Sequence, residues 1–429
     1  MPTAPRQAIS SLSLLSLALP TTLLAPIAQA AFFEDSSASL ETRNVYFNRD
    51  FREGPQQSKR DEWAQGFILN LQSGFTEGTV GFGVDALGML GIKLDSSPDR
   101  TGSGLLPTHD DGRAADEYSK LGVTAKARIS KTELRVGTLI PELPTLKPND
   151  GRILPQVFEG GLLTSGEIDG LDITAGRLKK AIDRDSTNAE DLALNNKNRR
   201  FDDTASADHF DMAGFDYKIN DNLTGRYHFA QLDDVYRQHF FGLLGSLPAG
   251  PGKLSADLRV AISDDHGSAK GGKVDNRAWN GSVSYAQSGH KFTVAYQHMS
   301  GDTAYPYIDG SDPFLVNFVQ INDFAEAGER SWQARYDYDF KALGVPGLSF
   351  MTRYIRGDNA ELTGVSGDAK EWERNIELKY VVQSGALKDV GVRLRHASYR
   401  SSLDRPAGDS RMRDADEVRL IVSYALSIW

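Results

Sequence analysis

The sequence predicts an all-β fold: an 18-stranded antiparallel transmembrane β-barrel with an inward-folded constriction loop. Three observations predict it. Apolar and polar residues alternate along most of the chain, short turns alternate with long polar stretches, and the last strand runs to a terminal aromatic residue. Successive side chains of a strand point to opposite faces. In a membrane barrel, the apolar face meets lipid and the polar face lines the lumen.

The C-terminal segment 417–429 shows the alternation most clearly. One parity is apolar throughout: Val418, Leu420, Val422, Tyr424, Leu426 and Ile428. The other is mostly polar: Glu417, Arg419, Ser423, Ala425 and Ser427, with Ile421 as the apolar exception. A strand that runs to the chain end suits a barrel whose last strand pairs with its first. The terminal strand of a β-sandwich is the alternative that this segment alone leaves open.

Residues 1–30 have the pattern of a secretory signal peptide. Arg6 is their single charge, an apolar core follows around 12–24, and Ala28-Gln29-Ala30 is a small-residue cleavage pattern. We therefore expect residues 1–30 to be removed and residues 31–429 to form a single outer-membrane barrel domain. Removal of Arg6 changes the net charge of −10 to −11.

The composition excludes several other classes of protein. The chain has no cysteine, and therefore no disulfide, no thiolate metal site and no cysteine nucleophile. After residue 30 it has no apolar run of roughly 18 residues, the length that a transmembrane helix needs. The hydrophobic fraction of 40% and the 41 glycines fit a large barrel with a wet interior. The acidic balance argues against nucleic acid as a partner.

Turns predict the number of strands. Eight short turns separate alternating segments: Ser73–Gly78, Ser130–Thr132, Glu167–Gly170, Asn220–Asn222, Leu247–Gly252, Gln287–His290, Lys341–Gly347 and Ser384–Asp389. Longer polar stretches lie between them: 96–116, 183–206, 264–276, 302–328, 357–371 and 401–415. This is the outer-membrane pattern with short turns on the periplasmic side. With both termini also periplasmic, eight short turns predict 18 strands, a size that leaves an aqueous channel.

Several motifs resemble the OprD family of outer-membrane carboxylate channels. They are Arg43–Phe51, Glu62–Phe67, Ser73–Asp85, Arg128–Glu133, Gly170-Leu-Asp, Asp234–Gln238, Ser331–Asp337 and Val345–Tyr354. The resemblance extends in order from about residue 32 to the C-terminus. It implies a barrel in the outer membrane of a Gram-negative bacterium, an inward-folded constriction loop and passive uptake of small carboxylates. It implies no cofactor, contact with outer-membrane lipid, and a monomer or weak homotrimer.

Five cations on the last three strands and the first are predicted to form a basic ladder in the lumen: Arg43, Lys379, Arg393, Arg395 and Arg419. Alternation points the last four inward, and closure of the barrel brings the first beside them. Guanidinium groups pair with carboxylates through two hydrogen bonds and remain charged at physiological pH. The family carries an arginine ladder on these strands. The alternative is a solvated wall in which the cations pair with acids such as Glu377 and Glu417.

The segment 139–158 is the predicted constriction loop. Its prolines exclude a regular central strand, and it is long for a connection between paired strands. Asn149-Asp150-Gly151-Arg152 is a turn signal that would present Arg152 at the tip of the loop. The resemblance assigns the eyelet role to Arg152. An external loop packed on its own prolines is the alternative.

The resemblance places three further residues at the constriction. Arg49 lies just past the first strand and matches the Asn-Arg-Asp motif of the family. Arg184 lies in a loop similar to a pore-facing arginine loop, and Asp323 matches a position that faces the ladder. An acid opposite the bases would steepen the local electric field. Ordinary loop charge is the alternative for each of the three.

The resemblance also suggests the substrate. Segments 90–100, 105–107, 156–165 and 274–277 are more similar to the OccK-type branch of the family, which favours monocyclic aromatic acids such as benzoate or vanillate. A channel for basic amino acids is the alternative.

An outer-membrane lipid hydrolase that uses His298 and Ser300 is a further alternative, because these two residues share a strand face. The neighbouring sequence offers no third partner for the histidine, and the chain has no Gly-x-Ser-x-Gly motif and no metal-ligand spacing. We therefore expect a channel and not an enzyme.

Overall fold

A computed structural model describes residues 32–54, 56–403 and 409–429 of the chain. The predicted signal peptide, residues 1–30, lies outside the described residues. Two short 3-10 helices, η1 (Lys197–Arg199) and η2 (Phe340–Leu343), accompany the strands of the described part. No helix in this part of the chain is long and apolar enough to cross a membrane.

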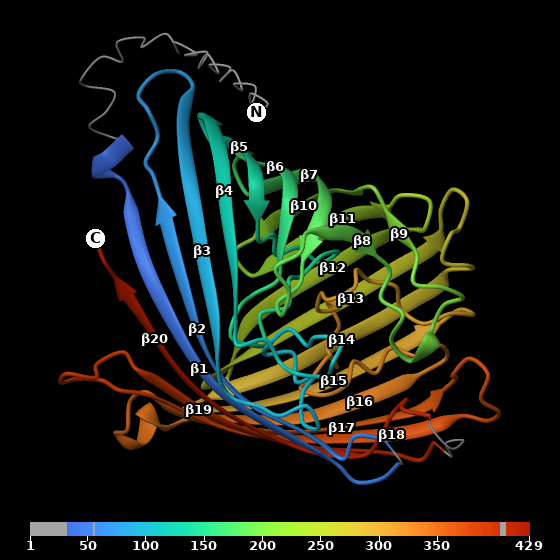
Figure 1. The fold of residues 1–429 in the computed structure, drawn as a ribbon. Helices are drawn as coiled ribbons and strands as arrows, with labels where there is room; N and C mark the ends of the chain where they lie inside the picture. The colour runs from blue at the N-terminus through green and yellow to red at the C-terminus, as the bar shows by residue number, and fades with distance from the viewer. Residues whose placement is uncertain (1–31, 55, 404–408) are drawn as a thin grey trace, which may run out of the picture.

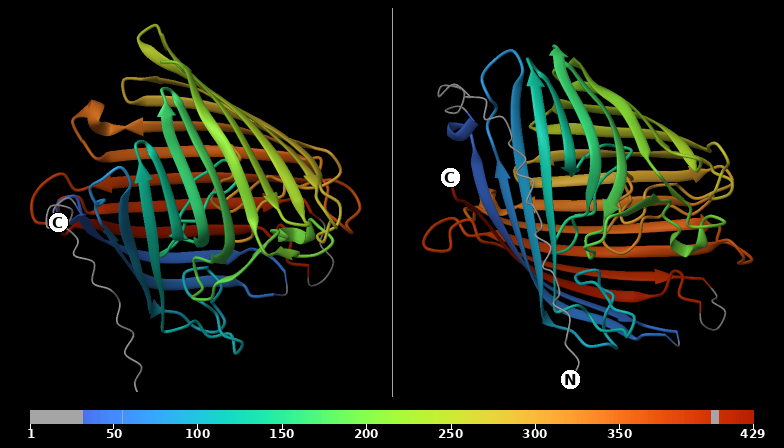
Figure 2. Two further views of the ribbon diagram at one scale, coloured as in Figure 1. Left: turned by 90° about the horizontal axis from the view of Figure 1, so that it is seen from above. Right: turned by 45° about the horizontal axis from the view of Figure 1, so that its top comes forward.

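Eighteen strands form one closed antiparallel sheet (Figure 1, Figure 2). In chain order they are β1 (Ser37–Phe51), β2 (Lys59–Gln72), β3 (Gly81–Asp95), β4 (Glu117–Ile129), β5 (Thr132–Leu139), β6 (Val157–Ile168), β7 (Leu171–Ile182), β10 (Phe210–Asn220), β11 (Leu223–Leu232), β12 (Tyr236–Ala249), β13 (Gly252–Asp265), β14 (Asp275–Gln287), β15 (His290–Ser300), β16 (Arg330–Asp339), β17 (Leu348–Ala360), β18 (Ala369–Val381), β19 (Gly391–Ser401) and β20 (Ala415–Ser427). Two short strands, β8 (Glu190–Ala193) and β9 (Ser206–Ala207), belong to the loop between β7 and β10. The predicted fold class and strand count are confirmed.

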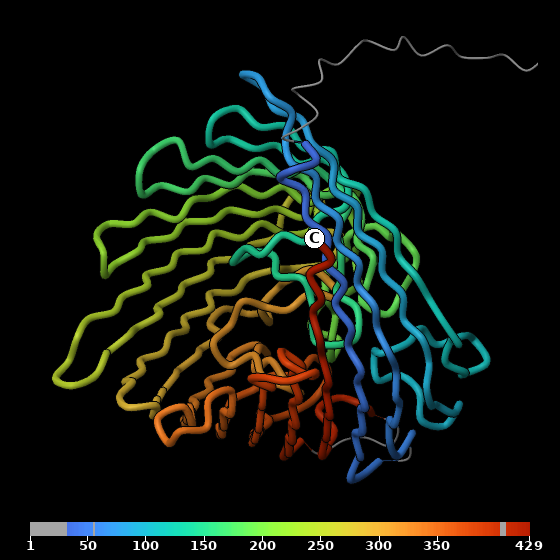
Figure 3. Tube along the Cα trace, turned by 90° about the vertical axis from the view of Figure 1, so that its left-hand side faces the viewer, coloured from blue at the N-terminus to red at the C-terminus, as the bar shows by residue number. Residues whose placement is uncertain are grey.

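The first and last strands close the barrel. β1 pairs with β20 from Ser39 opposite Ser427 to Phe51 opposite Ala415. Figure 3 shows the red C-terminal strand beside the blue N-terminal strand. The terminal strand of a sandwich is therefore the wrong alternative for segment 417–429.

The predicted short turns connect strands at one end of the barrel, called here the turn end. Longer connections, including loops 96–116, 140–156, 183–209 and 301–329, lie at the opposite end, called the loop end. The predicted turn at Leu247–Gly252 begins too early, because β12 continues to Ala249 and Leu247 and Pro248 still pair with Leu254 and Lys253. Arg49 was expected just past the first strand, but β1 continues to Phe51 and includes it. The predicted turn at Lys341–Gly347 includes the end of η2.

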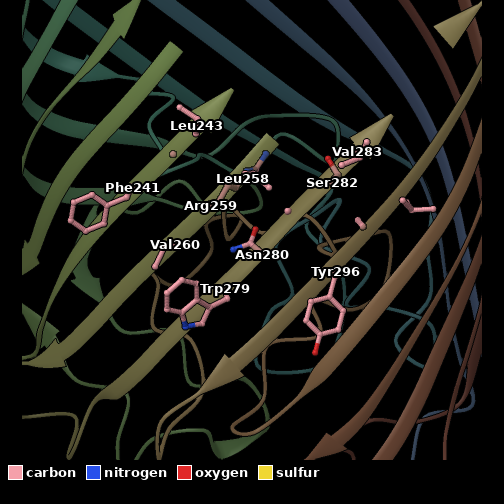
Figure 4. A pocket seen from close by; sticks show the side chains of 14 residues that line it. Phe241, Leu243, Leu258, Arg259, Val260, Trp279, Asn280, Ser282, Val283 and Tyr296 are labelled. Atoms are coloured by element: carbon pink, nitrogen blue, oxygen red, sulfur yellow. The ribbon is translucent and has the colours of Figure 1, made fainter. Parts of the chain in front are cut away.

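The outward face of the sheet is apolar, as alternation predicts. Phe292 is 57% exposed, Trp279 54% and Tyr296 51%. Figure 4 shows Trp279 of β14 between Phe241 of β12 and Tyr296 of β15. A hollow of about 710 Å³ on this face is lined mainly by such residues, so it is separate from the lumen. On β20, Leu420 and Leu426 are exposed on the same face, whereas Glu417 and Arg419 are buried inside.

Candidate functional site

The proline-rich loop 140–156 folds into the barrel and packs against β1 and β2. Ile153 and Leu154 are fully buried in a cluster with Val45 and Phe47 of β1. Gly66 of β2 permits this close approach, because a Cβ atom at position 66 would lie 2.5 Å from the carbonyl oxygen of Ile153. The loop therefore extends inside the barrel from β5 and β6 to the part of the wall that β1 and β2 form, with β3 and β4 between the two parts.

Loops 183–209 and 301–329 are joined inside the barrel by a buried ion cluster around Asp323. Its two carboxylate oxygens each accept a hydrogen bond of 2.7 Å from Arg200. Lys197 and the hydroxyl of Tyr307 also donate to them, at 3.2 and 3.0 Å. Burial opposes ionisation, but Arg200 and Lys197 outweigh it and hold the pKa of Asp323 well below its usual range. Asp323 thus joins two loops while it contributes to the lining of the lumen.

Loop 301–329 is also attached to the barrel wall. The carboxylate of Glu373 on β18 accepts hydrogen bonds from the backbone N–H groups of Gln320, Ile321 and Asn322, at 2.9 to 3.1 Å. Three amide donors on one carboxylate fix the backbone of this loop against β18. The loop therefore presents its side chains to the lumen from a fixed position.

A polar cavity of about 630 Å³ lies between these loops and the wall. Its basic lining residues are Arg49, Arg60, Arg152, Arg184, Lys197, Arg353, Arg395 and Arg419. Its acidic lining residues are Asp183, Asp185, Asp309, Asp312 and Asp323. Five of the eight cations project from strands β1, β2, β17, β19 and β20, whereas all five acids come from loops 183–209 and 301–329. All of the acids therefore come from the loops, whereas most of the cations come from the barrel wall.

The register places the predicted ladder on adjacent strands. Arg395 of β19 lies directly opposite Arg419 of β20. Arg393 lies opposite Lys379 of β18. Arg395 and Arg419 line the cavity. Arg393 and Lys379 lie nearer the turn end of their strands, outside the cavity lining.

Arg43 occupies the inner face of β1, opposite Ser423 of β20. Its guanidinium binds Glu41 at 2.7 Å and also pairs with Asp150 of the inward loop. It is absent from the cavity lining. The structure thus brings Arg43 to the turn of loop 140–156 at Asp150, and not to the row formed by Arg395 and Arg419.

Two acids hold the arginines of the wall in pairs. Glu417, which is fully buried, accepts hydrogen bonds from Arg49 at 2.7 Å and from Arg419 at 2.5 Å. Glu377 lies 3.1 Å from the Nε atom of Arg395 and 3.7 Å from that of Arg393. The acids that the solvated-wall alternative invokes are therefore present. Each is shared by two guanidinium groups, so positive charge remains in excess on this wall.

Phe47 of β1 lies among three of the guanidinium groups. Its ring centroid is 4.8 Å from the guanidinium carbon of Arg152, 5.3 Å from that of Arg419 and 5.6 Å from that of Arg49. The negative face of an aromatic ring attracts such cations. Sequence reasoning missed Phe47, although it has the same inward parity as Arg43 and Arg49.

Arg152 is buried beside Phe47 and bonds to backbone carbonyls. It donates to the oxygens of Ser103 at 2.7 Å and Gly151 at 2.9 Å. No ion pair joins Arg152 to an acid in the described part of the chain. Burial, together with nearby arginines, lowers the pKa of Arg152 well below its usual range. An anion that entered the cavity would supply the missing negative partner.

Sequence reasoning missed several other lining residues. Alternation could have found Arg60 of β2 and Arg353 of β17, because both have inward parity: Arg60 lies directly opposite Arg49, and Arg353 lies opposite Asn375. The acids Asp183 and Asp312 lie in irregular loops, where no periodicity marks them. Burial raises the pKa of each of these two to about 6.

The residues of the hydrolase alternative do not form a site. His298 lies opposite Trp279 and Arg330 on the outward face. The hydroxyl of Ser300 donates to the carbonyl oxygen of Arg277 at 3.0 Å. Within the described residues, no hydrogen bond joins His298 to Ser300, and no group of three or more His, Cys, Asp or Glu side chains is placed to hold a metal ion.

Comparison with known proteins gives consistent results. A family described as outer membrane porin, OprD family, matches residues 30–428. Porin D of Pseudomonas aeruginosa is 40% identical over 421 residues, which cover 92% of each chain. The crystal structure of OccK5 (OpdH) from the same organism is 59% identical with a TM-score of 0.83, over 93% of this chain and 100% of that one. The P. aeruginosa OpdK structure with vanillate is 43% identical with a TM-score of 0.85, over the same shares.

Proposed function

Because the chain belongs to the OprD family of outer-membrane porins, we propose that it takes up small organic anions, guided by the arginines of its inner wall. The protein is a channel of the Gram-negative outer membrane through which small molecules enter, and not an enzyme. The proposal concerns which molecules pass and which residues select them.

The excess of cations in the constriction carries the proposal. Arg60, Arg152, Arg184 and Arg353 line the cavity, and no ion pair joins any of them to an acid within the described residues. Charged groups in a pore select ions by replacing part of their hydration. Two unit charges about 4 Å apart interact by roughly 4 kcal/mol at an effective dielectric constant near 20. A fraction of this energy is enough to concentrate a carboxylate in the cavity.

Monocyclic aromatic acids such as benzoate are the preferred substrates in this proposal. The OpdK relative, 43% identical, has been solved with vanillate. The cavity lining also includes the rings of Tyr307 and Phe318, and a ring beside a basic wall suits a molecule with one apolar and one anionic end. Porin D, 40% identical, belongs to the same family, and a channel for basic amino acids is the alternative. Asp183, Asp309 and Asp312 could hold a cationic group in that case.

Uptake into liposomes that contain the purified protein tests the proposal. Labelled benzoate, labelled arginine and a neutral sugar of similar size would be compared, with protein-free liposomes as the control. We expect benzoate to enter fastest. Faster entry of arginine would favour the alternative, and equal entry of the sugar would contradict selection by charge.

A further inference from the structure

We propose that three arginines on the outward face of the barrel bind the phosphate groups of a lipid in the outer leaflet. The group, called here the outer arginine cluster, consists of Arg330 on β16, Arg356 on β17 and Arg374 on β18. It lies on the opposite face of the sheet from the cavity, so it is independent of the uptake proposal.

The register places the outer arginine cluster on the lipid-facing side. Arg356 lies opposite Trp332 of β16 and Trp372 of β18. Arg374 lies opposite Tyr354 of β17. All three arginines are exposed, and on β18 the outward parity continues from Arg374 through apolar residues that are also exposed, Ile376, Leu378 and Tyr380.

The three arginines step along a line of similar membrane depth. Strands of a membrane barrel are tilted by about 35–45°, so a row of paired residues is inclined to the membrane plane. The row that starts at Asp339, at the turn end of β16, runs through paired residues of β17 to β20 and reaches Val45, well inside β1. A line of constant depth must therefore step toward the turn end from β16 to β18. The cluster follows this direction. Arg356 lies one outward-facing residue closer to the turn end than Asp358, the partner of Arg330. Arg374 likewise lies one outward-facing residue closer to the turn end than Trp372, the partner of Arg356.

The cluster has no negative partner in the described structure. No ion pair or side-chain hydrogen bond to an acid involves Arg330, Arg356 or Arg374 within the described residues, although Asp358 lies opposite Arg330 in the register. Two other outward arginines are paired within the chain: Arg177 binds Asp211 at 2.6 Å and Arg400 binds Asp416 at 2.9 Å. Unpaired cations beside an apolar surface need a counter-charge from outside the chain.

Aromatic residues beside the cluster indicate headgroup level. The rings of Trp332 and Tyr354 are 5.7 Å apart, and those of Tyr354 and Trp372 are 5.9 Å apart. Aromatic girdles mark the membrane interface of outer-membrane barrels. Guanidinium groups bind phosphate through paired hydrogen bonds. The apolar surface next to the cluster, toward the turn end, would seat acyl chains, which favours a phosphorylated glycolipid of the outer leaflet over a free anion.

Native mass spectrometry of the detergent-purified protein with bis-phosphorylated lipid A tests the proposal. The cluster variant carries Arg330→Gln, Arg356→Gln and Arg374→Gln. The matched control removes three exposed cations at the turn end: Lys131→Gln, Lys341→Gln and Lys388→Gln. We expect wild type and control to retain a lipid adduct. The cluster variant should bind the lipid with an affinity that is lower by roughly tenfold or more. A graded loss in the three single variants would show that the effect is local and not misfolding.

Two further ligands distinguish the sources of the phosphate. Dephosphorylated lipid A should not bind, and excess inorganic phosphate should not displace the lipid. Equal binding of dephosphorylated lipid A would overturn the proposal in favour of apolar adsorption. Complete displacement by inorganic phosphate would overturn it in favour of a small-anion site, and an unchanged cluster variant would exclude the arginines.

Discussion

Arg395 of β19 lies directly opposite Arg419 of β20, with both side chains on the lumenal face. Like charges directly opposite each other destabilise an antiparallel pair. A second such pair, Arg49 opposite Arg60, lines the same cavity from β1 and β2. We interpret this repulsion as part of the selectivity device, because an anion between two such groups relieves it while it passes.

Replacement of Arg395 by glutamine should cut carboxylate uptake about threefold to tenfold, because a unit charge near the path contributes a few kcal/mol at most to an anion in a partly wet site. Assembly should be unaffected at a lumenal position. Arg395→Lys should reduce uptake less, since the charge stays and only the two-pronged hydrogen bonding is lost. Liposome uptake of benzoate measures both.

Lys379→Gln is the matched control for this experiment, because Lys379 is a lumenal cation outside the cavity lining. Its effect should be smaller than that of Arg395→Gln. If Arg395→Gln takes up benzoate at the wild-type rate, the ladder cations are only part of a solvated wall. Selection would then have to come from the loop around Arg152. High salt should weaken the wild-type preference for anions through screening.

Ion selectivity should depend on pH through Asp183 and Asp312. Burial raises the pKa of each to about 6, so both are charged above that pH and neutral below it. The cavity therefore becomes more positive as the pH falls through about 6. We expect the ratio of anion to cation permeability, measured as a reversal potential across planar bilayers, to rise over this range.

The double variant Asp183→Asn, Asp312→Asn should show, at every pH, the high ratio of anion to cation permeability that we expect of wild type at acidic pH. Asp110→Asn, at an exposed position of loop 96–116, is the control and should retain the wild-type pH profile. A pH profile that persists in the double variant would assign the titration to other groups of the cavity.

The sequence predicted the wall of the lumen better than its contents. A strand period of two fixes which residues face inward, so the inner positions of Arg393, Arg395 and Arg419 followed from alternation alone. The loops have no such period. Arg200 and Asp323 form their buried pair across more than a hundred residues of chain. Nothing local to either residue indicates the other, so Asp323 was expected to face the ladder and its role as a clamp was missed.

Asp323→Asn should loosen the contact between loops 183–209 and 301–329. Removal of one partner from a buried ion pair typically costs about 3–5 kcal/mol, because the remaining charge stays buried. Only loop contacts are lost, so we expect an intact barrel with noisier single-channel currents and faster proteolysis in these loops. Asp302→Asn, which removes an exposed partner of Lys273, should leave both measurements unchanged. Quiet currents in Asp323→Asn would show that attachment to Glu373 alone holds loop 301–329.

Gly66→Ala should increase single-channel conductance. An added Cβ at this position would lie 2.5 Å from the carbonyl oxygen of Ile153 and 2.9 Å from its Cβ atom, so loop 140–156 must move away from β2. Alanine otherwise suits a strand interior better than glycine by roughly 0.5–1 kcal/mol, so the strand itself should not be weakened. A loop displaced from the wall would narrow the lumen less.

Gly88→Ala on the neighbouring strand β3 is the matched control for Gly66→Ala. The nearest atom to its added Cβ would be 3.9 Å away, and position 88 lies on the outward face, opposite the exposed Leu121. Its conductance should equal that of wild type in planar bilayers. If Gly66→Ala also conducts like wild type, the packing of Ile153 against β2 does not set the constriction. The narrowest point would then have to be formed by loops 183–209 and 301–329 around the Asp323 cluster.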